Sequence, residues 1–192
     1  YYYGWGVAQS WKSAMEWFTK ASEHGHLKAM YELGRMHHYF IGCKQNSMQA
    51  LTLYSRAAEA GLGQAAKMLG QVYHTGELGV QDEERSKEWY ARAYDLLLEQ
   101  IFESDDAEAM NVLAWSYIDA EGVDRDYSQA FYYAKRSAGL NYAPAMNTMY
   151  ICYDDGYGVP VDKDEAMRWL QMAADLDQRS AQNNMARKLR ST

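Results

Sequence analysis

Five histidines are the first residues in this 192-residue chain whose chemistry points to a site. Imidazole nitrogens are common ligands of zinc and other transition metals. His37 and His38 are adjacent, however, and successive side chains of a helix point about 100° apart, so they form a poor chelating pair. No cysteine stands at zinc-ligand spacing from any of them. We therefore expect no metal site and no cofactor. The five are His24, His26, His37, His38 and His74.

Carboxylates flank several expected loops, at Asp119, Glu121, Asp154 and Asp155. A calcium loop gathers more oxygen ligands within one segment, so we interpret these four as solvated. The glycines of residues 156–158 follow no expected strand and predict no phosphate-binding loop. The chain also lacks a nucleophile elbow and a His-Glu-x-x-His motif. The sequence therefore predicts a protein that is not an enzyme, with a regulatory part of an enzyme as one alternative.

Small residues that recur at fixed intervals indicate how the remaining side chains are positioned. Two ladders share intervals of 36, 36, 44 and 36 residues. A period in this range predicts a solenoid, in which each unit packs only on its neighbours. The first ladder is Ala14, Ala50, Ser86, Ala130 and Ala166, and the second is Ala29, Ala65, Ala109, Ala145 and Ala181.

Each repeat is expected to be a hairpin of two helices, helix A followed by helix B. Four residues before each member of the first ladder stands a side chain that accepts hydrogen bonds at helix starts, which predicts the start of each helix B. In helix A, Gly34 and Gly70 predict close approach of the partner helix, while Tyr150 breaks that column and predicts more open packing. The expected caps are Ser10, Asn46, Asp82, Asp126 and Asp162.

The single 44-residue interval places eight extra residues between Tyr94 and Ala109. The segment 95–103 favours a helix, so we expect the third helix B to run on by about two turns. Its additional apolar residues either pack on the loop beside Asp105 and Asp106 or form a local contact patch.

The repeated residues resemble the Sel1-like repeat family, a relative of the tetratricopeptide repeat. The family pattern is A-x-x-x-L-G-x-x-Y, then G-x-G-V, D-x-x-x-A and W-[YF]-x-x-A-A-x-x-G. Residues 65–73, 158–174 and 50–61 match it best, whereas Lys87, the long third helix B and an incomplete first unit depart from it. The resemblance implies an all-α, right-handed α-α superhelix of about five helical hairpins. It also implies an adaptor that binds other proteins, as in many bacterial members.

We expect one domain over residues 1–192. Its units span approximately 1–25, 26–61, 62–105, 106–141 and 142–177, with a terminal helix at 178–192.

In tetratricopeptide-like solenoids helix A lines the concave side, which makes its remaining face a candidate binding groove. Asparagine both donates and accepts hydrogen bonds, so an asparagine column can clamp an extended peptide. Tyr31 and an exposed Trp115 are the expected anchors. Ordinary solvated positions are the alternative interpretation. The candidate partner-binding residues are Tyr31, Arg35, His38, Lys67, Gln71, His74, Asn111, Trp115, Asn147 and Asn183.

The net charge of −7 and a pI near 5.2 argue against nucleic acid or an anionic membrane as the main partner. No apolar run approaches the length needed to span a bilayer. We therefore predict a module that binds a protein or peptide on the helix-A face. The alternative is an inhibitory or immunity-type protein that blocks a folded toxin or enzyme.

Cys43 and Cys152 lie three repeats apart, beyond the reach of a disulfide in a solenoid. The chain begins at Tyr1 within a repeat, so we expect a missing segment upstream and a cytoplasmic or periplasmic location. The sequence names neither the partner nor an oligomeric state.

Overall fold

The computed structural model describes residues 10–176 of the chain, and within that range it contains nine α-helices and no strand. The all-α class predicted from the sequence is confirmed. The chain divides into two compact units, residues 1–96 and 97–192, and we describe each by itself. The expected remnant of the first helix A and the expected helix at 178–192 lie outside the described residues.

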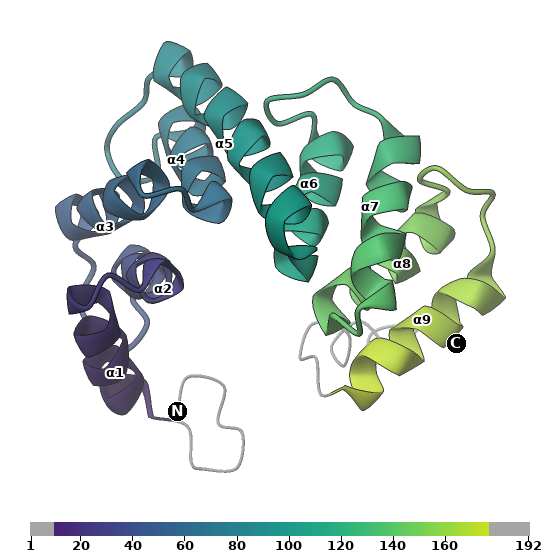
Figure 1. Ribbon diagram of the computed structural model, residues 1–192, viewed down its shortest axis with the longest axis horizontal. Helices are drawn as coiled ribbons and strands as arrows, with labels where there is room; N and C mark the ends of the chain where they lie inside the picture. The colour runs from purple at the N-terminus through teal and green to yellow at the C-terminus, as the bar shows by residue number, and fades with distance from the viewer. Residues whose placement is uncertain (1–9, 177–192) are drawn as a thin grey trace. The chain divides into compact units, whose positions relative to one another are not determined.

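The first unit stacks consecutive helices: α1 packs on α2, α2 on α3 and α3 on α4 (Figure 1), and Tyr90 of α5 lies against Gly70 of α4. Its core is continuous from α2 to α5 and includes the fully buried side chains of Tyr54, Leu69 and Val72. Its helices are α1 (Trp11–Glu23), α2 (Leu27–His38), α3 (Ser47–Glu59), α4 (Gly63–Thr75) and the first part of α5 (Glu83–Ser104).

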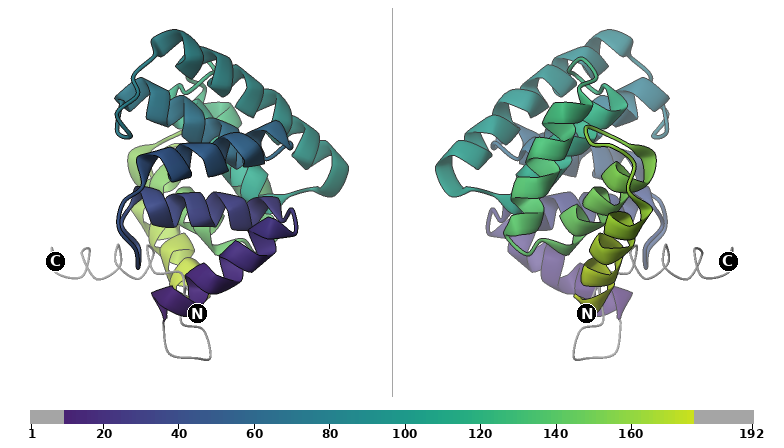
Figure 2. Two further views of the ribbon diagram at one scale, coloured as in Figure 1. Left: turned by 90° about the vertical axis from the view of Figure 1, so that its left-hand side faces the viewer. Right: turned by 90° about the vertical axis from the view of Figure 1, so that its right-hand side faces the viewer.

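The second unit repeats this architecture, with α7 packed on both α6 and α8, and α8 packed on α9 (Figures 1 and 2). Helices α6 and α8 also contact each other, as expected for the A helices of successive hairpins. Leu113, Met149 and Leu170 are fully buried there. The helices are the end of α5, then α6 (Ala107–Asp119), α7 (Tyr127–Gly139), α8 (Ala143–Asp155) and α9 (Lys163–Asp175).

The predicted caps start the B helices. In each case the capping oxygen accepts a hydrogen bond from the backbone N–H three residues further on, which satisfies one of the free donors of the first turn. The bonds run to Ser10 from Ser13 (3.2 Å), to Asn46 from Gln49 (3.0 Å), to Asp82 from Arg85 (3.1 Å), to Asp126 from Gln129 (3.0 Å) and to Asp162 from Glu165 (2.9 Å).

Helix α5 has 22 residues, whereas α1, α3, α7 and α9 have 13 each, so the predicted extension is confirmed. The extra turns divide their apolar side chains between two environments. Leu97 and Ile101 are buried, and Phe102 is 92% exposed. The extension is therefore held by part of its apolar surface and shows the rest to solvent.

The glycines inside helix A lie where the partner helix approaches closely, as predicted. A Cβ placed on Gly34 would lie 2.7 Å from Cε1 of Tyr54, and one placed on Gly70 would lie 2.6 Å from Cδ1 of Tyr90. Both tyrosines belong to the helix B of the same hairpin. The partner helix thus approaches through the edge of an aromatic ring, which leaves no room for a methyl group.

Candidate interaction surface

The first three candidate residues lie on α2. Tyr31 is half-buried against the core of the first unit, and its ring is tilted against Tyr54 with centroids 5.8 Å apart. The guanidinium of Arg35 lies 5.9 Å from the centroid of Tyr31 and forms an ion pair with Glu32 at 3.2 Å. Both side chains therefore make contacts within the protein and retain only part of their surface for a partner.

His38 is buried, with 4% of its side chain exposed, and it bridges two elements. Its Nε2 lies 3.1 Å from the carboxylate of Glu77, in the loop after α4, and its Nδ1 lies 3.3 Å from the hydroxyl of Tyr54 on α3. A carboxylate only accepts, so Nε2 carries the proton in the neutral ring and the Tyr54 hydroxyl donates to Nδ1. His38 thus ties the loop after α4 to the α2–α3 hairpin.

Several charges act on His38. Burial lowers its pKa below the ordinary 6.5, because the charged imidazolium is poorly solvated. Glu77 opposes this by raising the pKa, and Arg35 adds to the lowering. The ring of Tyr39 stacks on the imidazole with centroids 4.1 Å apart. The resulting neutral histidine is a buried structural residue.

The equivalent residues of α4 have a different environment. His74, one repeat after His38, is exposed, and its Nδ1 lies 3.0 Å from the carboxylate of Glu83. Lys67 and Gln71 are half-buried on the same helix. His38 and His74 therefore occupy the same position in successive repeats but pair with different glutamates, and His38 is buried whereas His74 is exposed to solvent.

In the second unit a third residue joins two of the candidates. The indole N–H of Trp115 on α6 donates to the hydroxyl of Thr148 on α8 at 3.1 Å. That hydroxyl donates to the side-chain oxygen of Asn111 at 2.8 Å. Asn111 is only 9% exposed. The three side chains form a hydrogen-bonded chain across the contact between α6 and α8.

This chain of bonds corrects two expectations about exposure. Trp115 is half-buried rather than exposed, because its N–H finds its acceptor inside the protein. The amide of Asn111 is buried, and its oxygen is already bonded to Thr148. Asn147 is half-buried, and Asn183 lies outside the described residues. Asn147 is thus the described member of the asparagine column that is not buried.

Thr148 and Glu77 were missed by reasoning from the sequence. The sequence carried no clear signal for Thr148, because the same position holds Glu32, Met68 and Val112 in the three preceding repeats and is therefore not consistently apolar. Glu77 carried no signal either, because its role depends on where the loop after α4 lies.

The other histidines have local roles. His26 caps α2 by accepting from the N–H of Ala29 at 3.3 Å, and the ring of His24 donates to the carbonyl of Lys20 at 2.8 Å. His37 is buried in the aromatic column expected for it, and burial lowers its pKa. Over residues 10–176 no three His, Cys, Asp or Glu side chains gather into a group that could hold a metal ion.

The two cysteines are free thiols. Cys43 lies in the loop after α2, with its sulfur 3.6 Å from Nδ1 of His37. Burial raises the pKa of both thiols, that of Cys152 to about 12. A thiol with a raised pKa is a weak nucleophile at neutral pH, so neither cysteine has the character of a reactive residue.

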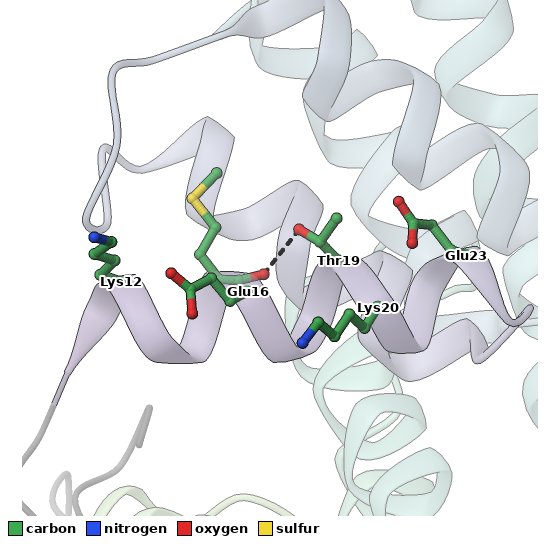
Figure 3. A pocket seen from close by; sticks show the side chains of 6 residues that line it. Lys12, Glu16, Thr19, Lys20 and Glu23 are labelled. Atoms are coloured by element: carbon green, nitrogen blue, oxygen red, sulfur yellow. Dashed lines mark hydrogen bonds between the residues drawn. The ribbon is translucent and has the colours of Figure 1, made fainter.

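A shallow hollow on α1 has the shape of a pocket but not the chemistry of one (Figure 3). All its lining residues belong to this single helix, so no side chains converge from different elements. The hydroxyl of Thr19 donates to the carbonyl of Met15 within the helix, at 2.8 Å. Opposite charges one turn apart fit a solvated helix face. The lining is Lys12, Met15, Glu16, Thr19, Lys20 and Glu23.

The repeat matches a known family along the chain. The family model described as Sel1 repeat matches residues 1–26, 27–62, 63–96, 107–142 and 148–178. The chain belongs to the Sel1 repeat family. The predicted solenoid of Sel1-like hairpins is thereby confirmed, and the break between residues 96 and 107 coincides with the extension of α5. No curated protein matches the chain.

Solved Sel1 repeat structures resemble the chain over nearly its whole length. A Sel1 repeat protein from Oxalobacter formigenes is 27% identical with a TM-score of 0.58, and the match covers 94% of this chain and 70% of that one. A protective antigen of uropathogenic Escherichia coli is 24% identical with a TM-score of 0.51, covering 94% and 38%. An immunity protein from Pseudomonas aeruginosa is 21% identical with a TM-score of 0.57, covering 90% and 61%. The two less identical structures share the fold alone.

The chain thus spans less than two thirds of the length of the antigen and of the immunity protein. Among the described helices, none is both long enough and apolar enough to cross a bilayer.

Proposed function

We propose that this Sel1 repeat chain is a binding module without catalytic activity, which holds a protein or peptide on the helix-A face. Sel1 repeat proteins generally mediate protein–protein interaction. The residues proposed for this chain are the half-buried side chains of the A helices. In the first unit they are Tyr31, Arg35, Lys67 and Gln71, and in the second they are Trp115 and Asn147.

The observation that carries the proposal is the bond from Trp115 to Thr148. A buried indole N–H without an acceptor disfavours partner binding, because its desolvation is not compensated. In this chain Thr148 already satisfies that donor, and the bond fixes the orientation of the ring. The exposed part of Trp115 is therefore a pre-organised apolar anchor that loses little entropy when a partner covers it.

Asn147 supplies the polar part of the same site. It stands one residue before Thr148, so the bond between Thr148 and Asn111 also fixes the backbone that carries it. An amide there can donate to and accept from the backbone of a bound chain. Trp115 with Asn147 is thus an aromatic anchor beside a hydrogen-bonding group.

The test is partner capture with variants of these two residues. Wild-type protein, Trp115→Ala and Asn147→Ala are each immobilised, and partners retained by wild type are identified by mass spectrometry and purified for calorimetry. We expect Trp115→Ala to weaken binding by about thirtyfold or more, as for a central aromatic anchor, and Asn147→Ala by about tenfold. Met48→Ala, at a 79% exposed residue of α3, is the matched control and retains full affinity.

Circular dichroism must show unchanged helix content in each variant. Asn111→Ala is unsuitable as a binding test, because it removes a buried side chain that is bonded to Thr148 at 2.8 Å and so changes the packing between α6 and α8. Equal affinity of wild type and Trp115→Ala for the purified partner would remove the helix-A face from consideration.

A second candidate function is inhibition of a folded toxin or enzyme. The observation that favours it is the exposure of large aromatic side chains on the B helices, Phe102 and Tyr132, which a peptide confined to the A helices would not reach. The immunity protein noted above shares this fold. A captured partner separates the two candidates, since a short peptide fits the groove, while a folded enzyme that loses activity on binding fits inhibition.

A further inference from the structure

Beyond the helix-A face, unit 2 carries a second surface built from α5 and α7. The guanidinium of Arg136 on α7 pairs with the carboxylate of Asp105, just after α5, at 2.6 Å. Tyr132 precedes Arg136 by one turn, and its ring lies 5.6 Å from the guanidinium. Phe102 precedes Asp105 by three residues on α5. The ion pair therefore joins two helix faces, and we call Phe102, Asp105, Tyr132, Arg136 and Leu140 the α5–α7 surface.

Three large apolar side chains of this surface are exposed to solvent. Phe102 is 92% exposed, while Tyr132 and Leu140 are each 51% exposed. Leu140 follows Arg136 by one turn, so the apolar side chains lie on either side of the ion pair. The ion pair brings the end of α5, which carries Phe102, next to the face of α7 that carries Tyr132. Large exposed apolar side chains gathered on one surface are typical of interaction sites in soluble proteins.

The surrounding scaffold holds these residues firmly. Leu97 and Ile101 are buried and anchor the end of α5, and Ser137 on α7 donates a hydrogen bond to the carbonyl of Ala107, at the start of α6. Phe102 is thus presented by a helix end whose position is fixed. The extension that presents it belongs to repeat three alone, so this surface is a feature of this chain rather than of the repeat.

Charge identifies the kind of partner. Residues 97–176 contain fifteen Asp and Glu against five Lys and Arg, whereas residues 10–96 contain ten of each. The exposed carboxylates of Glu99 and Glu103 stand on the same turns of α5 as Phe102. A second copy of the chain would bring like charges together, and an anionic surface would be repelled. A positively charged partner is attracted.

We propose that the α5–α7 surface docks a basic amphipathic segment of a partner protein. Apolar side chains of that segment cover Phe102, Tyr132 and Leu140, and flanking Lys and Arg residues face the carboxylates of Glu99 and Glu103. The charges speed association and select the partner, and the apolar contacts hold the complex.

Calorimetry with two synthetic peptides tests the proposal. The first is a helix of about 18 residues with leucines on one face and lysines on the other. The second carries glutamate in place of every lysine. We expect the basic peptide to bind wild type, to bind Phe102→Ala at least about tenfold more weakly, and to lose affinity as salt rises. Met48→Ala, at an exposed residue of the first unit, where acidic and basic residues balance, binds as wild type does.

Four outcomes overturn the proposal. They are equal affinity of Phe102→Ala and wild type, equal binding of the acidic peptide, self-association in sedimentation experiments that Phe102→Ala abolishes, and loss of the basic peptide in Trp115→Ala. The last outcome would mean that the basic peptide binds at the helix-A face and not at a separate surface. Because Phe102 is exposed, its removal leaves the thermal midpoint unchanged, so loss of binding cannot come from unfolding.

Discussion

Unit 1 and unit 2 form the same contact between helix A and helix B from different residues. In unit 1 a glycine on helix A meets a tyrosine on helix B, as Gly34 with Tyr54 and Gly70 with Tyr90. In unit 2 the repeat register places Ala114 opposite Ala134, both fully buried. The next hairpin has Tyr150 and Leu170 at these positions, in the same core.

The comparison shows that the repeat constrains the pair rather than either residue. Protein interiors are close-packed, so a tyrosine on helix B leaves room only for glycine on helix A, and two alanines make the same contact with a methyl group on each helix. The same rule explains why Tyr150 interrupts the column of small residues on helix A. Its larger ring stands where glycine stood, and the opposing tyrosine is replaced by a smaller leucine.

The largest effects are expected at the buried leucine column that the two units share. Leu69→Ala in unit 1 and Leu113→Ala in unit 2 each remove a fully buried side chain and should cost about 2–5 kcal/mol of unfolding free energy through the cavity left behind. Urea denaturation followed by circular dichroism measures this cost. Equal losses of unfolding free energy would show that the two units resemble each other in energetics as well as in structure. An unchanged urea midpoint in either variant would contradict the repeat register that places both leucines in one core column.

The glycine–tyrosine pair gives the next largest effect. Gly70→Ala forces a methyl group against the ring of Tyr90, and overpacking of this kind costs about 1–3 kcal/mol although alanine favours the helix. Adding Tyr90→Leu, the residue of the last hairpin, should recover part of that loss. Chemical denaturation of both single variants and the double variant gives the coupling. Strict additivity would mean that the two residues do not constrain each other.

Acid should weaken unit 1 through His38. The folded-state pKa of His38 lies below its unfolded value of 6.5, so its contribution is complete above about pH 6.5 and is lost as the pH falls through the folded pKa. Thermal midpoints at pH 7.5 and 5.5 measure the loss, and His38→Gln should reduce it. Glu77→Gln should enlarge it, because Glu77 raises the pKa of His38. If neither variant alters the change in thermal midpoint between the two pH values, His38 is not its cause.

The ion pair of the α5–α7 surface should contribute least to stability. Asp105 is 69% exposed and Arg136 is 37% exposed, and pairs of this kind contribute up to about 1 kcal/mol. We expect Asp105→Asn to lower the unfolding free energy by less than that amount, and by less still at high salt. Denaturation at two salt concentrations checks it. A loss above about 2 kcal/mol would mean that unit 2 depends on this contact for its fold, unlike an ordinary surface pair.

Much of the fold followed from local and periodic rules. The caps at Ser10, Asn46, Asp82, Asp126 and Asp162, the extension of α5 and the buried alanine ladders were all predicted, and the structure confirms them in the residues it describes. Such features depend on neighbours within about one helical turn or on a spacing that recurs. The sequence contains that information directly.

The tertiary structure decided which of the candidate side chains are accessible. His38 and His74 share a column, yet the loop after α4 covers one with Glu77 and leaves the other beside Glu83 in solvent. Likewise, Thr148 on α8 forms hydrogen bonds with Trp115 and Asn111 on α6, and these bonds hold both side chains partly or fully inside the protein. The burial of a side chain depends on groups from other elements, whose approach a periodic pattern does not specify. The chain alone therefore determined the repeat, and packing between its elements determined which residues of that repeat a partner can reach.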